Sequence, residues 1–206
     1  GDHRDLHLSI RRQRQMCIRD RMVQAFAMLA AALDMRFDSS GWALDPVLPL
    51  ARRETWSLFS ADTGARLDEH LLGHAASELF GGTLQIEPKK DFSKGAKPSA
   101  DRGILRLRVP ELYETALVVR LMPVERAALL TAEALRVAGV MGGAGMDSMV
   151  KRARKLIQIE TSLCDRQSLS LACLLSRAFL GAILPPHEDA LFGIKGARER
   201  LSMLHP

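Results

Sequence analysis

The longest apolar stretch of the chain, Ser168 to Leu184, constrains the fold most. It follows Asp165, whose carboxylate can cap a helix, and it ends before Pro185-Pro186, which cannot continue one. Apolar residues recur nearly all round the helical wheel, as is typical of a helix buried at the centre of a domain. Arg177 interrupts the stretch, which is also short for a membrane span. The sequence therefore predicts a buried central helix over residues 166–184.

Most of the remaining chain also favours helices. Ala and Leu are abundant, whereas aromatic residues make up only 5% of the sequence, and this composition suits helices better than strands. Helical spacing of apolar residues, together with Gly or Pro near the ends, predicts six more helices. They cover residues 22–35, 46–60, 63–80, 123–141, 147–158 and 187–204. We therefore expect a mainly α fold, with five to seven packed helices around the central one.

Two short segments alternate between apolar and other residues with a period of two. They are Thr83 to Glu87 and Ile104 to Val109, and such alternation predicts strands with one buried face. Arg106 and Arg108 would then point outward. Together the segments predict a small β-hairpin over residues 83–109. Residues 115–121 fit a third strand or part of a helix equally well.

The first residues of the chain resemble something other than native protein. Arg11 to Asp20 match, codon by codon, the translation of a transposase-type sequencing-library adapter, CGT CGG CAG CGT CAG ATG TGT ATA AGA GAC. Gly1 to His7 match the flow-cell end of the same adapter, and the three residues between fit an index of the usual length. The resemblance implies that residues 1–21 are adapter-derived, non-native and disordered. An insert joined to an adapter begins at an arbitrary break, so we expect a metagenomic fragment truncated ahead of Met22.

The charge balance changes once this stretch is set aside. The full chain carries a formal charge of +5, with 29 Lys and Arg against 24 Asp and Glu. Residues 1–21 hold six Arg and three Asp, so residues 22–206 carry +2. We treat these residues as a single mostly helical domain. Their net charge alone no longer indicates a nucleic-acid partner.

The cysteines indicate a reducing compartment. On one helix, Cys164 and Cys173 would lie about 13 Å apart along the axis, too far for a disulfide. Unpaired thiols suit the cytoplasm, and we expect no membrane partner. The sequence carries no dinucleotide or Walker fingerprint, so we predict no cofactor.

A basic segment near the middle of the chain is the first candidate site. Residues 130–157 read as a helix, a Gly-containing turn and a second helix, which is typical of a helix-turn-helix. The turn, GVMGGAG, is longer than that motif uses. The basic helix predicted over 147–158 would offer four cations to nucleic acid or to an acidic partner, or form a solvated surface. They are Lys151, Arg152, Arg154 and Lys155.

The basic loop over residues 88–103 is the second candidate. It would join the two strands of the hairpin, and its cations could follow a nucleic-acid backbone together with the arginines of the second strand. A polar insertion without a ligand is the alternative. The residues are Lys89, Lys90, Lys94, Lys97 and Arg102 in the loop, and Arg106 and Arg108 beside it.

A possible metal site is the third candidate. His70, His74 and Glu78 recur at intervals of four residues, so one helical face could present two nitrogen ligands and one oxygen ligand. No Glu follows His70, and the general base of the HExxH motif is therefore missing. Two histidines without a catalytic role fit the pattern as well.

These observations predict a non-enzymatic binding or regulatory protein, such as a bacterial regulator. We expect it to contact nucleic acid or an acidic partner through the 147–158 helix and the 88–103 loop. Two alternatives remain open. One is a small metal-dependent or acid–base enzyme built on His70 and His74, and the other is a structural subunit of a complex.

Overall fold

The computed structural model describes residues 49–88, 101–141, 143 and 145–204. All of them belong to one compact unit, Val47–Pro206. The predictions for the adapter-like residues 1–21, for a helix over 22–35 and for the lysines of the 88–103 loop fall outside the described residues.

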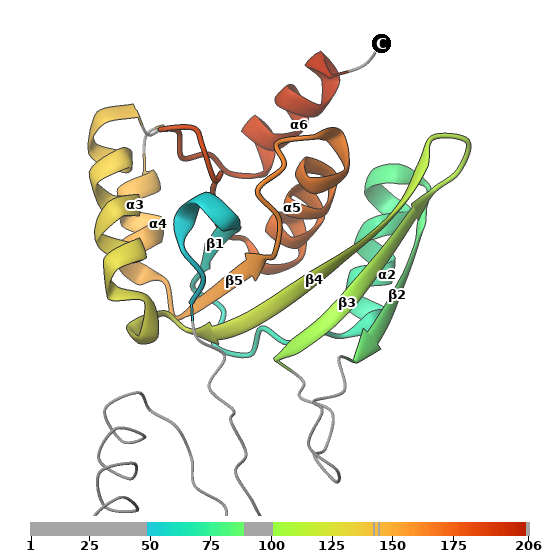
Figure 1. Cartoon of the computed structure of the whole chain (residues 1–206), viewed down its shortest axis with the longest axis horizontal. Coiled ribbons are helices and arrows are strands. Elements are labelled where there is room, and N and C mark those ends of the chain that lie inside the picture. Colours follow the sequence, from blue (N-terminus) through green and yellow to red (C-terminus); the bar gives the residue numbers. More distant parts are fainter. Residues whose placement is uncertain (1–48, 89–100, 142, 144, 205–206) are drawn as a thin grey trace, which may run out of the picture. The chain divides into compact units, whose positions relative to one another are not determined.

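Six strands form one antiparallel sheet in the order β2-β3-β4-β5-β1-β6 (Figure 1). The strands are β1 Trp56–Ser60, β2 Thr83–Pro88, β3 Arg102–Val109, β4 Tyr113–Pro123, β5 Lys155–Ile159 and β6 Ala182–Leu184. The helices are α2 Glu69–Phe80, α3 Ala128–Met141, α4 Met146–Arg152, α5 Arg166–Phe179 and α6 Ile194–Met203, with short 3-10 turns at Arg52–Glu54 and Val124–Ala127. The prediction of a mainly α fold is wrong, because the central layer of this mixed α/β fold is a sheet.

Helices pack on both faces of the sheet, but they do not cover both faces equally. α2 and α5 pack on one face, with α6 against α5, around a core that includes Leu58, Leu105 and Ile157. α3 and α4 pack on the other face, around Phe59 and Leu156. This second core draws its strand residues from β1, β5, β6 and the last part of β4. Within the described residues, β2 and β3 therefore carry a helix on one face only (Figure 1).

The central helix is confirmed in place but not in length. α5 is buried on almost every side, and the Asp165 carboxylate caps it by accepting from the Ser168 amide at 2.8 Å. It ends at Phe179, because Leu180 adopts a left-handed conformation with φ 51°. Ala182–Leu184 then form β6 beside β1. The predicted extent of 166–184 thus joined a helix to a strand, since both are buried and rich in apolar residues, and periodicity cannot separate them.

Two other predicted helices contain strands. Residues 46–60 hold the turn Arg52–Glu54 and the fully buried strand β1. Residues 147–158 hold all but the first residue of the two-turn helix α4, which ends at Arg152. They also hold most of β5. Both strands are covered on two faces and so lack the alternation that marks a half-buried strand. The segment 115–121, left open above, belongs to β4.

The hairpin prediction is confirmed, and it forms one end of the larger sheet. β2 and β3 pair from Thr83 opposite Arg108 to Pro88 opposite Gly103. The helix predicted over 63–80 begins later, at Glu69, where the Asp68 side chain accepts from the His70 and Leu71 amides. It ends at Gly81 with φ 61°, the left-handed conformation that glycine adopts readily.

Gly82 is required by close packing of the chain against β3. A Cβ at this position would lie 2.5 Å from the backbone carbonyl oxygen of Arg108. We expect Gly82→Ala to lower the free energy of unfolding by about 2 kcal/mol, because the clash is with backbone held in a β ladder. Gly73→Ala is the matched control: its Cβ would meet nothing within 4 Å, and in α2 the change should stabilise by about 0.5–1 kcal/mol. Denaturant unfolding of both variants tests this, and equal effects would contradict it.

Candidate functional site

The uncovered half of the sheet presents a polar, arginine-rich surface. Residues of β3 alternate, so those at 103, 105, 107 and 109 are buried against the helices and the others point to the open side. On β3 the open side carries Arg102, Ile104, Arg106 and Arg108. Pairing with β4 places Arg120 opposite Arg102, and Glu114 opposite Arg108. We call this surface the open face, and its residues from the three strands are Thr83, Gln85, Glu87, Arg102, Ile104, Arg106, Arg108, Glu114, Ala116, Val118 and Arg120.

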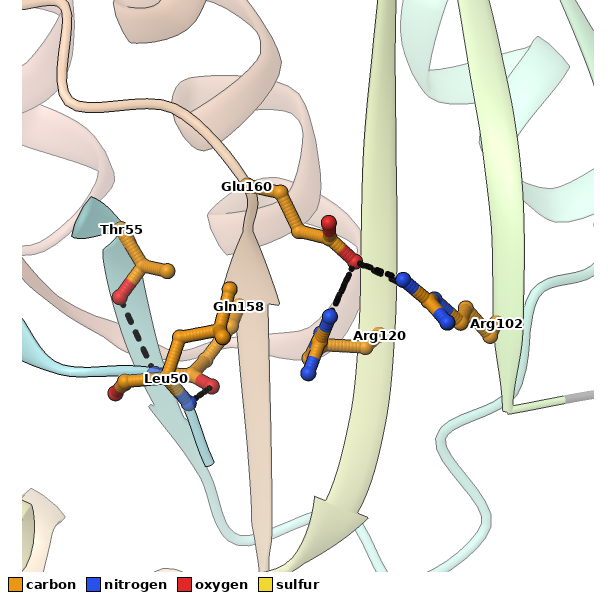
Figure 2. Close-up of polar contacts among 6 residues, drawn as sticks. All are labelled: Leu50, Thr55, Arg102, Arg120, Gln158 and Glu160. Atoms are coloured by element: carbon orange, nitrogen blue, oxygen red, sulfur yellow. Dashed lines mark hydrogen bonds and ion pairs between the residues drawn. The ribbon is translucent and has the colours of Figure 1, made fainter. Parts of the chain in front are cut away.

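A charged triad lies where the open face meets the part of the sheet under α3 and α4. Glu160, directly after β5, accepts hydrogen bonds from Arg102 and Arg120 on the same oxygen, Oε1 (Figure 2). The Nη2 atoms lie 2.9 Å away for Arg102 and 2.5 Å away for Arg120. Their side chains are 29% and 9% exposed, and that of Glu160 is 20% exposed. The carboxylate therefore separates two guanidinium groups that face each other across neighbouring strands.

The ionisation of Glu160 follows from this geometry. Partial burial alone would raise its pKa, but the hydrogen bonds and charge of Arg120, and then those of Arg102, hold the pKa of Glu160 below its usual value. The residue is an anion at neutral pH. Its second oxygen, Oε2, accepts no hydrogen bond from the residues that the structure describes.

Gln158 forms a neighbouring buried network. Its Oε1 accepts from the Leu50 amide at 2.8 Å, and its Nε2 donates to the Leu50 carbonyl at 3.1 Å (Figure 2). Nε2 also lies 3.0 Å from the Thr55 hydroxyl and 3.3 Å from that of Ser57. The Gln158 side chain thus takes the place of a backbone hydrogen-bond partner for Leu50, and it holds the segment before β1 against β5. Because these groups satisfy one another, the network is a stabilising contact.

The arginines predicted to point outward do so. Arg106 forms a two-pronged ion pair with Glu87, with Nε 2.7 Å from Oε1 and Nη2 3.3 Å from Oε2. Arg108 is exposed and forms no ion pair with a described residue. Exposed pairs such as Arg106–Glu87 contribute little to stability and exchange readily with other anions.

Comparison with protein-family models, with curated proteins and with solved structures found no match. The chemistry of the described residues therefore carries the functional argument.

The basic residues on and after α4 and the arginines of β3, which the sequence predicted to share an interface, lie over different parts of the sheet. α4 packs against β1 and β6, whereas the arginines of the open face lie on β3 and β4. Lys151 pairs with Asp147 at 3.2 Å, and the Arg152 Nε donates to the Ser148 carbonyl at 3.2 Å. Arg154 lies in the link after α4, and Lys155 begins β5. The four cations thus do not share a helix, and a helix-turn-helix with a helix over 147–158 is not formed.

The proposed metal ligands lie on the exposed side of α2. His70 and His74 are exposed, and both oxygens of Glu78 accept from Arg177 Nη2 at 3.1 and 3.2 Å. Among the described residues, no group of three or more His, Cys, Asp or Glu is placed to hold a metal ion. Metal binding by the two histidines stays a prediction without a third ligand in the described part of the chain.

A second charged network was not anticipated from the sequence. Arg52, which is 12% exposed, contacts Glu133 on α3 at 2.5 Å and Asp189 at 3.0 Å. It also donates to the backbone carbonyls of Pro185 and Glu188. It therefore ties the segment before β1 to α3 and to the loop before α6, which is a structural role.

None of the helices in the described ranges is long and apolar enough to cross a membrane.

Proposed function

We propose that this chain is a non-enzymatic binding protein that contacts the phosphate backbone of nucleic acid through its open face and the adjoining β2–β3 hairpin. The observation that carries the proposal is the concentration of positive charge there. Residues 83–109 contain seven Lys and Arg against three acidic residues, a net charge of +4. Residues 22–206 together carry only +2, so residues 22–82 and 110–206 together carry −2.

The side chains of the open face suit phosphate better than bases. Arginine presents a planar fork of donors that matches phosphate oxygens two at a time. The open face holds four arginines and no aromatic residue, so it lacks the stacking surfaces that proteins use to hold bases. Contacts of this kind give salt-dependent binding with little sequence preference. The triad around Glu160 fixes Arg102 and Arg120, while Arg106 and Arg108 are the groups most accessible to a ligand.

The same proposal assigns the protein to the cytoplasm. Cys164 and Cys173, the two cysteines among the described residues, are free thiols, and free thiols persist in reducing compartments. Nucleic acid is accessible to a protein there.

Binding should be measured by fluorescence anisotropy with a labelled single strand and its duplex. The protein should start at Met22, because the Arg-rich stretch over residues 11–21 would itself bind nucleic acid. If the face neutralises about four phosphates, log K should fall with log salt at a slope of about −3 for the single strand. Arg106→Glu with Arg108→Glu should weaken binding at least about tenfold and reduce the slope by about 1 or more.

The matched control is Lys151→Glu with Arg152→Glu on α4. The control changes the net charge by the same amount as the open-face variant. Each variant also removes one exposed ion pair, which is Lys151–Asp147 in the control and Arg106–Glu87 in the open-face variant. We expect the control to weaken binding much less. Equal losses in both variants, or no binding at low salt, would overturn the proposal. Binding of polyglutamate in place of nucleic acid would replace it with an acidic protein partner.

A further inference from the structure

The side of α3 that faces away from the sheet carries exposed apolar residues. Leu129, Val140 and Met141 are 89%, 71% and 66% exposed, and they are three of the nine large apolar side chains exposed in the described part of the chain. The buried residues of α3 lie on its other side, in the second core. Figure 1 shows α3 at one edge of this structure, away from α5 and α6. Within the described residues, the outer side of α3 is therefore open to a partner.

The exposed residues of α3 form a stripe along the helix. Leu129 and Val140 are eleven residues apart, which is about three turns, so they lie within about 20° of each other around the helix axis. Glu133 and Arg136 lie between them along the chain, within about 40° of Leu129 around the axis. Their side chains are 35% and 57% exposed. The stripe therefore has an apolar residue near each end and two opposite charges in its middle.

The stripe is complementary to itself when two copies of α3 pack antiparallel about a twofold axis. Such an axis makes every contact occur twice, because residue i of one copy meets residue j of the other and the reverse. When the axis is level with residues 134 and 135, Leu129 lies opposite the partner's Val140, and Glu133 lies opposite the partner's Arg136. A parallel pair would instead place Arg136 opposite Arg136, and facing like charges oppose association. The order of the charges therefore favours the antiparallel arrangement.

Glu133 and Arg136 both keep hydrogen-bonding capacity for a partner. Glu133 accepts from Arg52 through Oε1, and its Oε2 accepts no hydrogen bond from the described residues. Arg136 contacts Asp189 at 3.4 Å, and both of these side chains are more than half exposed. Exposed pairs of this kind contribute little to stability, so a partner's carboxylate can compete for the Arg136 guanidinium.

An open groove lies beside the N-terminal end of α3. It is lined by residues 49–52, 126–130 and Glu133, and seven of these ten residues are apolar. The same antiparallel register places the partner's Met141 opposite Ala128, which lines the groove. A methionine side chain is flexible and fills irregular apolar gaps. Each copy thus offers a groove at one end of α3 and, at the other end, a methionine that reaches the partner's groove.

Gly139 leaves a hollow for the partner's Leu129. A Cβ at position 139 would meet nothing within 4 Å, so the space beside this glycine is open. Arg136, Gly139 and Val140 have the spacing of residues that surround one side chain of a facing helix. In the antiparallel register that side chain is Leu129, and the glycine lets it approach closely.

We propose that α3 is the interface of an antiparallel homodimer of this chain. Leu129 of each copy packs against the partner's Val140. Glu133 pairs with the partner's Arg136, and Met141 enters the partner's groove. One helix per copy buries less surface than the roughly 1,200–2,000 Å² of stable interfaces, so the dimer is weak and reversible. None of these residues belongs to the open face, so the proposal does not depend on nucleic-acid binding.

Sedimentation velocity of the full chain tests the proposal. Between about 5 and 300 µM the sedimentation coefficient should rise from the monomer value toward the dimer value, with a Kd of about 10–100 µM, as suits a small interface. Leu129→Glu should raise the Kd at least about tenfold, because it places a carboxylate in an apolar contact twice per dimer. Met203→Glu is the matched control, since Met203 on α6 is 79% exposed, and it should leave the Kd within about twofold.

A second pair of variants tests the charges. Arg136→Glu would place a carboxylate opposite the partner's Glu133 and should raise the Kd at least about tenfold. Arg177→Glu is the matched control, because it makes the same change of charge on α5 and also removes one exposed ion pair, with Glu78. The control should leave the Kd within about twofold. All four substituted side chains are exposed or partly exposed, so folding is preserved.

Cross-linking tests the register. In a background of Cys17→Ser and Cys164→Ser, a short bis-maleimide should join Leu129→Cys chains to Val140→Cys chains when the two are mixed. Neither variant alone should cross-link efficiently, because the two copies of residue 129 would lie about 16 Å apart along the helix. A monomer at every concentration, variants no weaker than their controls, or equal cross-linking in the mixture and in either variant alone would each overturn the proposal.

Discussion

Leu58→Ala and Phe59→Ala are each expected to lower the free energy of unfolding by about 3–4 kcal/mol. The two residues are neighbours in β1, so their side chains point to opposite faces of the sheet, yet both are fully buried. Leu58 packs in the core under α2 and α5, and Phe59 packs in the core under α3 and α4. Each truncation leaves a cavity in a different core.

Chemical denaturation followed by circular dichroism measures both effects. Leu129→Ala is the control, because Leu129 on α3 is 89% exposed and its truncation should change stability by less than about 0.5 kcal/mol. If either β1 variant retained the stability of the parent protein, the strand would be covered on one face only, and the arrangement of two cores would be wrong.

The errors of sequence-based prediction follow the same division of the sheet. β2 and the outer part of β3 have one face open, so their residues alternate and the hairpin was predicted correctly. β1, β5 and β6 are covered on both faces, so buried residues follow one another in segments such as WSLFS and KLIQI, without a regular alternation of apolar and polar residues. Such segments do not reveal a period of two, and Ala- and Leu-rich surroundings favoured helices.

β4 shows both behaviours within one strand. Its first half contributes exposed residues to the open face, whereas residues 119–122 are all buried. This change explains why 115–121 could not be assigned from the sequence. The outward positions of Arg106 and Arg108 were predictable because they belong to the alternating part of β3.

The triad around Glu160 could not be found by local patterns. Arg102 and Arg120 precede Glu160 by 58 and 40 residues, and only the strand order brings them together. The one local signal was a charged residue at each of two unusual places: Arg120 within the apolar run TALVVRLMP, and Glu160 at the end of KLIQI. Charged residues in buried strands require partners, and a search for such partners would have paired these strands.

Glu160→Gln is expected to lower the free energy of unfolding by about 2–3 kcal/mol at pH 7. Removal of one member of a buried ion pair costs about 3–5 kcal/mol, and partial exposure of this triad reduces that value. The loss arises because Arg102 and Arg120 lie directly opposite each other on β3 and β4 and would face each other without a carboxylate between them. Adding Arg102→Gln to the Glu160→Gln variant should therefore restore part of the stability.

The pH dependence of the stability difference between the parent protein and the Glu160→Gln variant gives a second test. The folded state depresses the pKa of Glu160, so its contribution is fully present above the unfolded value of about 4.3 and is lost as pH falls through the folded value. The stabilities of the parent protein and the Glu160→Gln variant should differ by a constant amount between about pH 6 and 8, and should begin to converge as the pH falls below about 4. Glu114→Gln, an exposed carboxylate on the open face, is the control and should have little effect at any pH. If the Glu160→Gln variant were as stable as the parent at pH 7, the carboxylate would not hold the two arginines together. The open face would then lack the fixed arginine geometry that the proposed phosphate binding requires.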